Sequence, residues 1–244
     1  MGEIIGTALL ILFGDGVVAN VLLGKSKGQN SGWIVITTGW AMAVFVGVYA
    51  TASISGAHLN PAITLGLATA GNIPWSTVPV YIIGQFIGAF IGALLVFLGY
   101  FPHWAETESA GLKLAVFSTA PAIRNTVWNL FMEILGTFAL MFGVFMIKGA
   151  FMGEGTGPTI TPLQLGALGA IPVAFLVWAI GLSLGGPTGY AINPARDLGP
   201  RIMHAILPIP GKGGSDWGYS WIPVVGPCIG GVLAAIVWMA LGRP

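Results

Sequence analysis

Long apolar stretches dominate the chain, and most charged side chains fall in the gaps between them. Six stretches have the roughly 20 apolar residues that a membrane-spanning helix needs. They cover residues 2–23, 33–54, 78–100, 126–148, 163–184 and 221–241. The pattern predicts an all-α membrane protein with six transmembrane helices.

Two further apolar stretches, residues 60–70 and 193–207, are too short to cross a bilayer. Each begins with Asn-Pro. Asparagine is a favoured N-cap, and proline is favoured at the first helical position because its missing N–H would be unpaired there anyway. We therefore expect two re-entrant half-helices.

The two halves of the chain repeat one another. Glu3-Ile-Ile-Gly-Thr matches Glu133-Ile-Leu-Gly-Thr, and the segment ending in Asn60-Pro-Ala matches the one ending in Asn193-Pro-Ala. Glycines 84, 88 and 92 match Gly226, Gly230 and Ala234, spacings that let helices approach closely in lipid. Three spans in each half is an odd number, so the second half must enter the membrane inverted. We expect one channel domain over 1–244, with repeats at about 1–115 and 122–244 and the functional site near the midplane.

Composition narrows the function classes. Hydrophobic residues make up 55% of the chain and charged residues 7%, against about 25% charged in soluble domains. The net charge of +1 gives no basic field for nucleic acid. One cysteine and three scattered histidines favour no metal site, and nothing in the chain calls for a cofactor. No arrangement of catalytic residues stands out, so an enzyme is not expected.

The duplicated Asn-Pro-Ala motif has a physical consequence. Inverted symmetry brings two helix N-termini, each a partial positive charge, to the same point in the membrane. Each asparagine oxygen can cap its own helix, which leaves the amide N–H₂ free to donate into a lumen. The extended runs 53–59 and 185–192 would supply carbonyl acceptors beside it. The motif residues are Asn60, Pro61, Ala62, Asn193, Pro194 and Ala195.

Ser-Gly-Ala-His-Leu-Asn-Pro-Ala and Gly-Tyr-Ala-Ile-Asn-Pro-Ala-Arg-Asp together resemble the paired signature of the aquaporin family, over essentially the whole chain. The resemblance is to its aquaglyceroporin, or glycerol-facilitator, branch. It implies six tilted helices, two half-helices meeting at the Asn-Pro-Ala motifs, and one pore per subunit of a homotetramer. It also implies a place in the plasma membrane with both termini cytoplasmic.

The same resemblance implies a selectivity filter of Trp40, Gly181, Tyr190 and Arg196. Water-selective members typically carry histidine where Gly181 stands, so glycine leaves room. Trp40 and Tyr190 would form an apolar corner opposite Arg196, a slot suited to a short polyol. Glycerol with water is the first candidate; urea, dihydroxyacetone and undissociated lactic acid stay open, because glycerol facilitators usually carry Phe where this chain has Tyr190. Ions and protons would be excluded.

Four further residues are predicted to support the pore. Acidic residues inside spans are functional candidates, and the resemblance implies that Glu3 and Glu133 hold the loops leading into the Asn-Pro-Ala motifs; a proton relay is the other interpretation. His58 is expected to brace its loop or to line a gate. Asp197 stands in the first turn of its half-helix, where the helix dipole favours an acidic side chain.

The competing hypothesis is an ion-coupled secondary transporter, which would use the two glutamates as its coupling site. Asp15, without a counterpart in the second half, is interpreted as a polar contact between helices.

Overall fold

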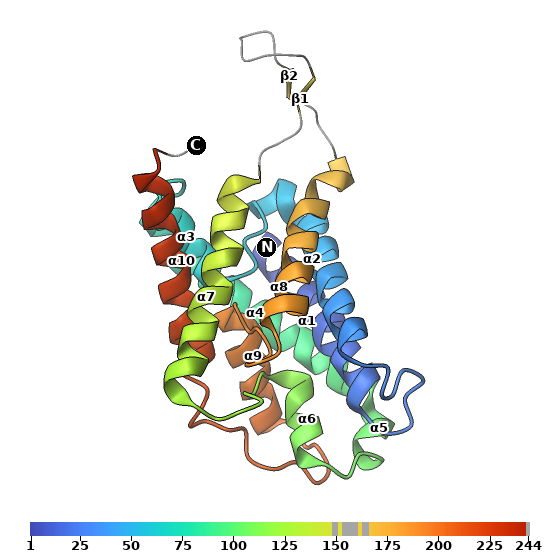
Figure 1. The fold of residues 1–244 in the computed structure, drawn as a ribbon. Helices are drawn as coiled ribbons and strands as arrows, with labels where there is room; N and C mark the ends of the chain where they lie inside the picture. The colour runs from blue at the N-terminus through green and yellow to red at the C-terminus, as the bar shows by residue number, and fades with distance from the viewer. Residues whose placement is uncertain (148–150, 153–160, 163–165, 243–244) are drawn as a thin grey trace.

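The protein is a bundle of tilted helices, described by a computed structural model over residues 1–147, 151–152, 161–162 and 166–242 (Figure 1). Within these residues five helices are long and apolar enough to cross a membrane. They are α1 (Gly2–Leu22), α2 (Trp33–Ser55), α4 (Val78–Gly99), α7 (Thr126–Met146) and α10 (Ile222–Ala240). Five of the predicted spans are therefore confirmed to within two residues at the ends that the structure describes; residue 148, the predicted end of the fourth, lies outside the described residues.

The fifth predicted span, 163–184, is α-helical over only part of its described length, and its first three residues, 163–165, lie outside the described residues. Its α-helix, α8, covers only Ile171–Leu184 and follows a 3₁₀ segment, η2, at Gly166–Ala170. The run Gly-Ala-Leu-Gly-Ala before Pro172 explains the change, because glycine weakens an α-helix and proline is favoured only in its first turn. Rises of about 1.5 Å per α residue and 2.0 Å per 3₁₀ residue give roughly 30 Å for the two together, the thickness of a hydrocarbon core.

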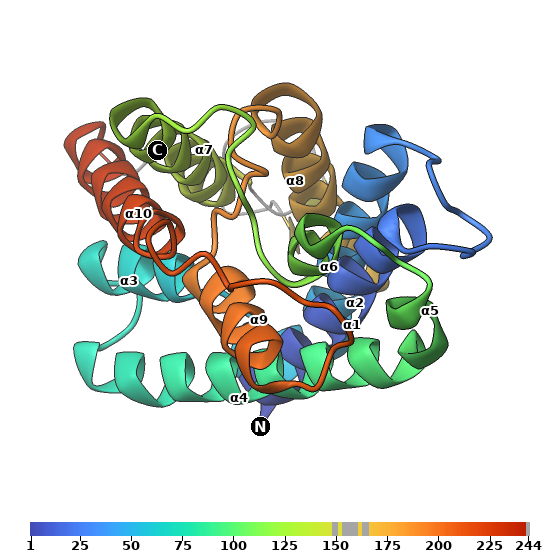
Figure 2. The ribbon, with the colours of Figure 1, turned by 90° about the horizontal axis from the view of Figure 1, so that it is seen from below.

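The two half-helices are α3 (Pro61–Thr69) and α9 (Pro194–Ile206), both opened by Asn-Pro as predicted. They lie in opposite halves of the bundle, α3 above and α9 below in the view of Figure 1. Each packs against a long helix of the other repeat, α3 on α10 and α9 on α4 (Figure 2). The repeats are therefore interlocked and do not stand side by side.

Glycines bring the long helices of each repeat into contact, as their spacing predicted. A Cβ on Gly88 would collide with the Ile4 carbonyl oxygen in α1, and a Cβ on Gly230 would collide with the Ile134 carbonyl oxygen in α7. The α1–α4 and α7–α10 pairs are thus built alike. Beyond the glycine face, α4 exposes large apolar side chains at Ile83, Ile87, Ile91, Leu94 and Leu98, as a lipid-facing helix does.

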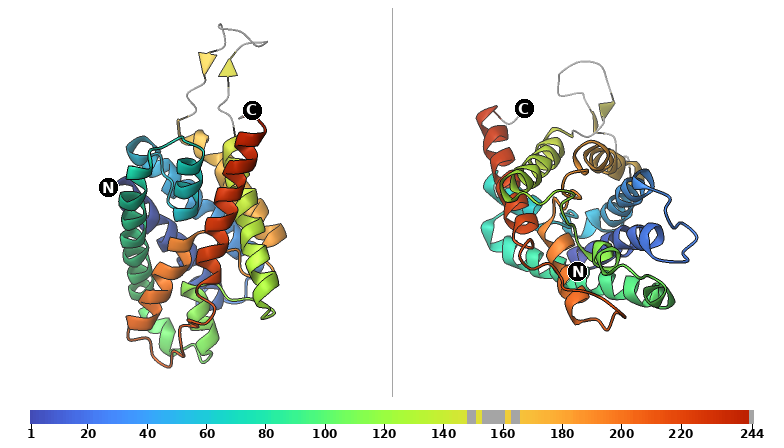
Figure 3. Two further views of the ribbon diagram at one scale, coloured as in Figure 1. Left: turned by 90° about the vertical axis from the view of Figure 1, so that its left-hand side faces the viewer. Right: turned by 60° about the horizontal axis from the view of Figure 1, so that its bottom comes forward.

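The connections contain short elements that the apolar pattern did not predict. Three are helical: η1 (Trp75–Thr77), α5 (Phe101–Ala105) and α6 (Ala110–Phe117). Strands β1 (Phe151–Met152) and β2 (Thr161–Pro162) pair antiparallel over two residues each. The start of α1 and the end of α10 lie in the half of the bundle away from α5 and α6 (Figures 1 and 3), as an even number of crossings requires.

Candidate functional site

The two Asn-Pro-Ala motifs meet in the middle of the bundle, and the asparagine of each is hydrogen-bonded to the residue that precedes the other. The Asn60 side-chain oxygen caps α3 by accepting from Ala62 N at 2.9 Å, and its Nδ2 donates to the Ile192 carbonyl at 2.8 Å. Asn193 caps α9 in the same way and donates from Nδ2 to the Leu59 carbonyl at 2.8 Å. The sequence predicted amides free for the lumen. Only one N–H of each amide is left for the lumen, because the other donates to the opposite loop.

The loops that lead into the two half-helices have the same unusual backbone. Glycines 56 and 189 have φ of 79° and 81°. Next to them, non-glycine residues also have positive φ: Ala57 at 50° and Leu59 at 52°, matched by Tyr190 at 40° and Ile192 at 43°. Such conformations cost of order 1–3 kcal/mol each for non-glycine residues and persist only where surrounding contacts impose them.

Glu3, from the first turn of α1, supplies those contacts for the first loop. Its carboxylate is 4% exposed and accepts from the backbone N–H of His58 at 3.0 Å and of Leu59 at 2.8 Å. The Ser55 hydroxyl at 2.6 Å and the Gln85 amide at 2.7 Å complete its partners. Every carboxylate oxygen is therefore occupied by a donor that fixes the loop or an adjoining helix.

Glu133 in α7 does the same for the second loop. The fully buried carboxylate accepts from Ala191 N at 3.1 Å, Ile192 N at 2.9 Å and the Thr188 hydroxyl at 2.7 Å. A carboxylate with three hydrogen-bond donors is a charge-assisted anchor for the strained backbone. Neither glutamate lines a cavity described below.

With the N–H groups turned toward the glutamates, the carbonyls of both loops are left without internal partners. Among the described residues, no hydrogen bond occupies the carbonyl oxygens of residues 56–58 or of residues 189–191. All six residues line the cavities that follow the bundle axis. The loops therefore offer acceptors to a solute, three in each repeat.

Three cavities follow one another through the bundle. The first, of about 180 Å³, is lined by loop residues Gly56–Asn60 on one side and by Leu10, Val44, Val48 and Val177 among others on the opposite one. The middle cavity is the smallest of the three, at about 50 Å³, and shares Asn60 and Asn193 with the first. The third, of about 250 Å³, shares Trp40, Tyr190 and Arg196 with the middle one. Together they form a path with a polar side and an apolar side.

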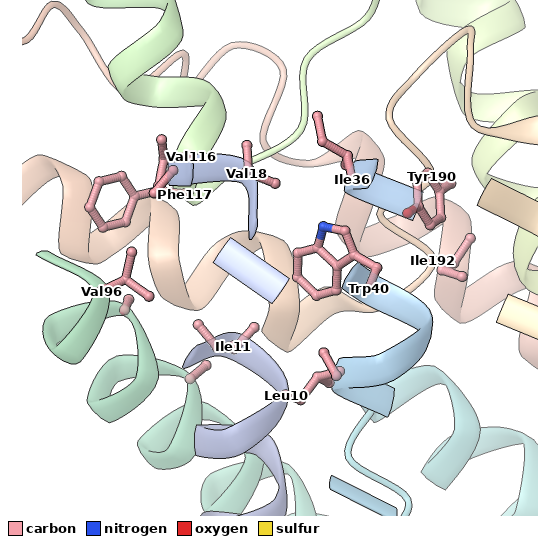
Figure 4. Packing of buried hydrophobic residues seen from close by; sticks show 14 of the residues in the cluster. Leu10, Ile11, Val18, Ile36, Trp40, Val96, Val116, Phe117, Tyr190 and Ile192 are labelled. Carbon is pink, nitrogen blue, oxygen red and sulfur yellow. The ribbon is translucent and has the colours of Figure 1, made fainter. Parts of the chain in front are cut away.

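Trp40 and Arg196 form the boundary between the middle and third cavities. Arg196 follows directly on the second motif in the first turn of α9, and its guanidinium lies 3.9 Å from the centroid of the Trp40 ring. The ring stands between Leu10 and Ile36, with Tyr190 and Ile192 of the second loop beside it (Figure 4). Trp40 Nε1 and the Tyr190 hydroxyl are buried and have no hydrogen-bond partner among the described residues.

Gly181 makes room in a different way from that expected. It lines none of the three cavities, and a Cβ there would lie 2.8 Å from Tyr190 Cζ and 3.0 Å from its hydroxyl. The space left by the missing side chain is occupied by the Tyr190 ring. Trp33 holds this corner, because its Nε1 donates to the Gly181 carbonyl at 3.1 Å and its ring meets Tyr190 edge-on.

His58 and Asp197 connect the loops to their surroundings. His58 lines the first cavity, and its Nδ1 lies 3.1 Å from the Thr64 hydroxyl in α3 while its ring packs on Tyr81. Asp197 accepts from both the backbone N–H and the hydroxyl of Thr119, at 2.7 and 2.6 Å. It also pairs with Arg201 at 2.8 Å.

Arg201 is a residue that the sequence analysis missed. It is fully buried and donates to the carbonyls of Thr119 and Ser215 at 2.8 Å each, tying two connecting segments to α9. Its spacing of four from Asp197 was the available signal, since such pairs meet on a helix face. A second arginine, Arg124, binds Asp216 nearby, and that hydrogen bond raises the pKa of the Arg124 guanidinium.

Comparisons with known proteins agree with this geometry. The model of the family described as major intrinsic protein matches residues 1–238. A probable glycerol uptake facilitator protein of Thermotoga maritima is 58% identical over 238 residues, which are 98% of this chain and 97% of the relative. The glycerol uptake facilitator protein of Bacillus subtilis is 53% identical over 239 residues, 98% of this chain and 83% of that one. The X-ray structure of the aquaglyceroporin from Plasmodium falciparum superposes with a TM-score of 0.82 at 29% identity, covering 97% of this chain and 93% of the other.

A match over nearly the full length at this identity settles the class of protein. The fold is that of an aquaporin, and the chain is a multi-pass membrane channel and not an enzyme. The predicted fold class and family are confirmed. The chain belongs to the major intrinsic protein family.

Proposed function

We propose that this channel conducts glycerol passively, with water as a second permeant. The observation that carries the proposal is the two-sided path: loop carbonyls and Arg196 along one side, Trp40 and aliphatic side chains such as Leu10 and Val44 along the other. A short polyol has hydroxyls on one edge and a carbon backbone on the other, so it matches both sides at once. The glycerol-facilitator names of the relatives support the same solute.

Passage would proceed by exchange of hydrogen bonds. The Arg196 guanidinium donates to a solute hydroxyl at the filter, and the free carbonyls of residues 189–191 and then 56–58 accept from successive hydroxyls. At the centre, the remaining N–H of Asn60 and of Asn193 donates. Each step replaces one partner by another of similar strength, which keeps the solute weakly bound and mobile.

Exclusion of ions would have two sources. The N-termini of α3 and α9 meet at the Asn60–Asn193 pair, so two partial positive charges face the middle cavity. The second source is the filter, where a small ion would lose its hydration beside Arg196 and Trp40. A metal cation or a hydronium ion meets positive potential at the centre, and the donors of the asparagines orient water so that it cannot relay a proton across it.

Tyr190 bears on which other solutes pass. Tyr190 lines the middle cavity together with Arg196, while its hydroxyl is buried against Gly181, so a shift of this ring changes the width of the filter. Urea, dihydroxyacetone and undissociated lactic acid carry both donors and acceptors and are the further candidate permeants. We also propose the family arrangement for the assembly: a homotetramer in the plasma membrane with both termini cytoplasmic.

Stopped-flow light scattering on proteoliposomes tests the solute. Gradients of sorbitol, glycerol, urea and lactic acid are applied in turn to vesicles with and without protein. We expect fast glycerol entry that does not saturate. Gly181→His should lower glycerol entry at least tenfold, because the new side chain displaces Tyr190 into the path. Gly186→His, at an exposed glycine with no atom near its Cβ, is the matched control and should conduct normally.

Two outcomes would overturn the proposal. Water flow without glycerol entry would mean that Tyr190 closes the slot to polyols. Saturable entry that follows a proton or sodium gradient would favour the ion-coupled transporter.

A further inference from the structure

Asp15 is a carboxylate in the middle of α1 that the proposed pore does not yet use. It is 0% exposed, and neither of its oxygens has a hydrogen-bond partner among the described residues. Acidic side chains are rarely left this way, because a buried charge is costly unless it is paired. The side chain differs in this respect from Glu3 and Glu133, whose oxygens are all occupied by loop donors.

The position of Asp15 relates it to the filter. Arg196 Nη1 lies 4.0 Å from Asp15 Oδ1, the shortest approach of any carboxylate to that guanidinium in the described chain. The preceding residue, Gly14, allows α1 to lie directly against the Trp40 ring, since any side chain there would collide with it. Arg196 lies over the same ring. The glycine therefore brings α1, and Asp15 with it, up to the filter.

The other acidic group near the filter, Asp197, already has partners of its own. Asp197 is buried near the same helix start but is bound by Arg201 and Thr119. Arg196 has no other ion pair in the described residues and borders two cavities. Asp15 is thus the carboxylate left to balance the charge of Arg196.

We propose that Asp15 is a specificity-determining residue of the filter, acting as the buried counter-charge of Arg196. It has two effects. It holds the guanidinium back over Trp40, which keeps the slot open, and it makes the filter an ion pair with no net charge instead of a lone cation. A lone cation would repel cations but attract small anions; the pair rejects both, because neither finds compensation for its lost hydration. This role rests on the proposed channel function.

The sign of ion leakage tests the proposal. Planar bilayers containing many channels are placed under a potassium chloride gradient, and the reversal potential is measured. Wild-type channels should carry no current above that of the lipid. Asp15→Asn, which keeps the shape and removes the charge, should leak anions, raising anion conductance at least about tenfold. Arg196→Ala leaves the carboxylate alone and should leak cations. The double variant, with neither charge, should show a reversal potential near zero, because it prefers neither anions nor cations.

Controls separate this role from a structural one. Asp216→Asn removes a carboxylate from a surface ion pair with Arg124 and should give no current above that of the lipid. Asp15→Ser provides a smaller neutral variant if Asp15→Asn does not assemble, and elution at the wild-type volume establishes assembly for each. Glycerol entry by the wild type, measured in the same preparations, reports on the proposed function separately. If glycerol enters through the wild type but the neutral Asp15 variants stay silent or leak cations, the counter-charge role is wrong.

Discussion

Replacing Glu133 by glutamine is the sharpest test of how the pore loops are held. The change keeps the size and shape of the side chain but puts an N–H₂ group where one oxygen stood. Because Oε1 accepts from Thr188 and Ala191 and Oε2 from Ile192, any orientation of the amide sets one donor against another.

The magnitude follows from these bonds. Loss of one charge-assisted bond costs about 1.5–3 kcal/mol, and the surviving bonds fall to neutral strength, about 1 kcal/mol weaker each. Burying a neutral amide costs less than burying a charge, which offsets part of this loss, so the free energy of unfolding should fall by roughly 2–4 kcal/mol in all. The backbone strain at Tyr190 and Ile192, with φ of 40° and 43°, is of the same order. We therefore expect the loop to relax and its carbonyls to leave the path.

Two measurements check Glu133→Gln. Thermal unfolding of the purified protein should begin several degrees lower, and stopped-flow glycerol entry into proteoliposomes should fall at equal protein content. Glu106→Gln is the matched control, because Glu106 pairs with Lys25 at an exposed site where such bridges contribute at most about 1 kcal/mol. If both variants unfold and conduct alike, the carboxylate does not hold the loop and the reasoning fails.

Two further substitutions have matched controls within the chain. Gly88→Ala should lower the free energy of unfolding by about 1–3 kcal/mol and reduce the yield of folded protein, because the methyl group collides with the α1 backbone. Gly99→Ala in the same helix meets no atom within 4 Å and should be neutral. Equal unfolding temperatures for the two variants would contradict this. Arg201→Ala should cost about 3–5 kcal/mol by leaving a buried carboxylate unpaired. Arg124→Ala, at a side chain 58% exposed, should cost about 1 kcal/mol or less, and the same melting assay would refute the distinction if the order were reversed.

The parts of the fold that could be predicted from the sequence depend on local composition. Five spans are visible because the length of an apolar run by itself decides whether a helix can cross lipid. The half-helices could be predicted because each asparagine caps its helix through a local bond, to the N–H two residues after Asn60 and after Asn193. The fifth span departs from an α-helix at Gly166–Ala170, where an apolar but glycine-rich run satisfies a hydropathy window without favouring an α-helix.

What escaped prediction depends on contacts between distant segments. Asp15 and Arg196 are 181 positions apart, so nothing in either neighbourhood indicates that they meet. The Tyr190 ring fills the space at Gly181 in α8, and Trp33, from α2, borders the same corner. The use of one N–H of each asparagine by the opposite loop could not be inferred from capping chemistry, which concerns only the oxygen.

The reciprocal bonds between the asparagines and the opposite loops have a consequence for biosynthesis. Asn60 donates to a carbonyl 132 residues further along the chain, and Leu59 accepts from a residue 134 further along. At 5–20 residues per second, a ribosome needs roughly 7–26 s to make the intervening chain. During that interval the first re-entrant loop must wait in the membrane with its donor and its acceptor unmatched. The nascent first half therefore holds its loop without these two bonds, and the arrival of α9 supplies both partners together.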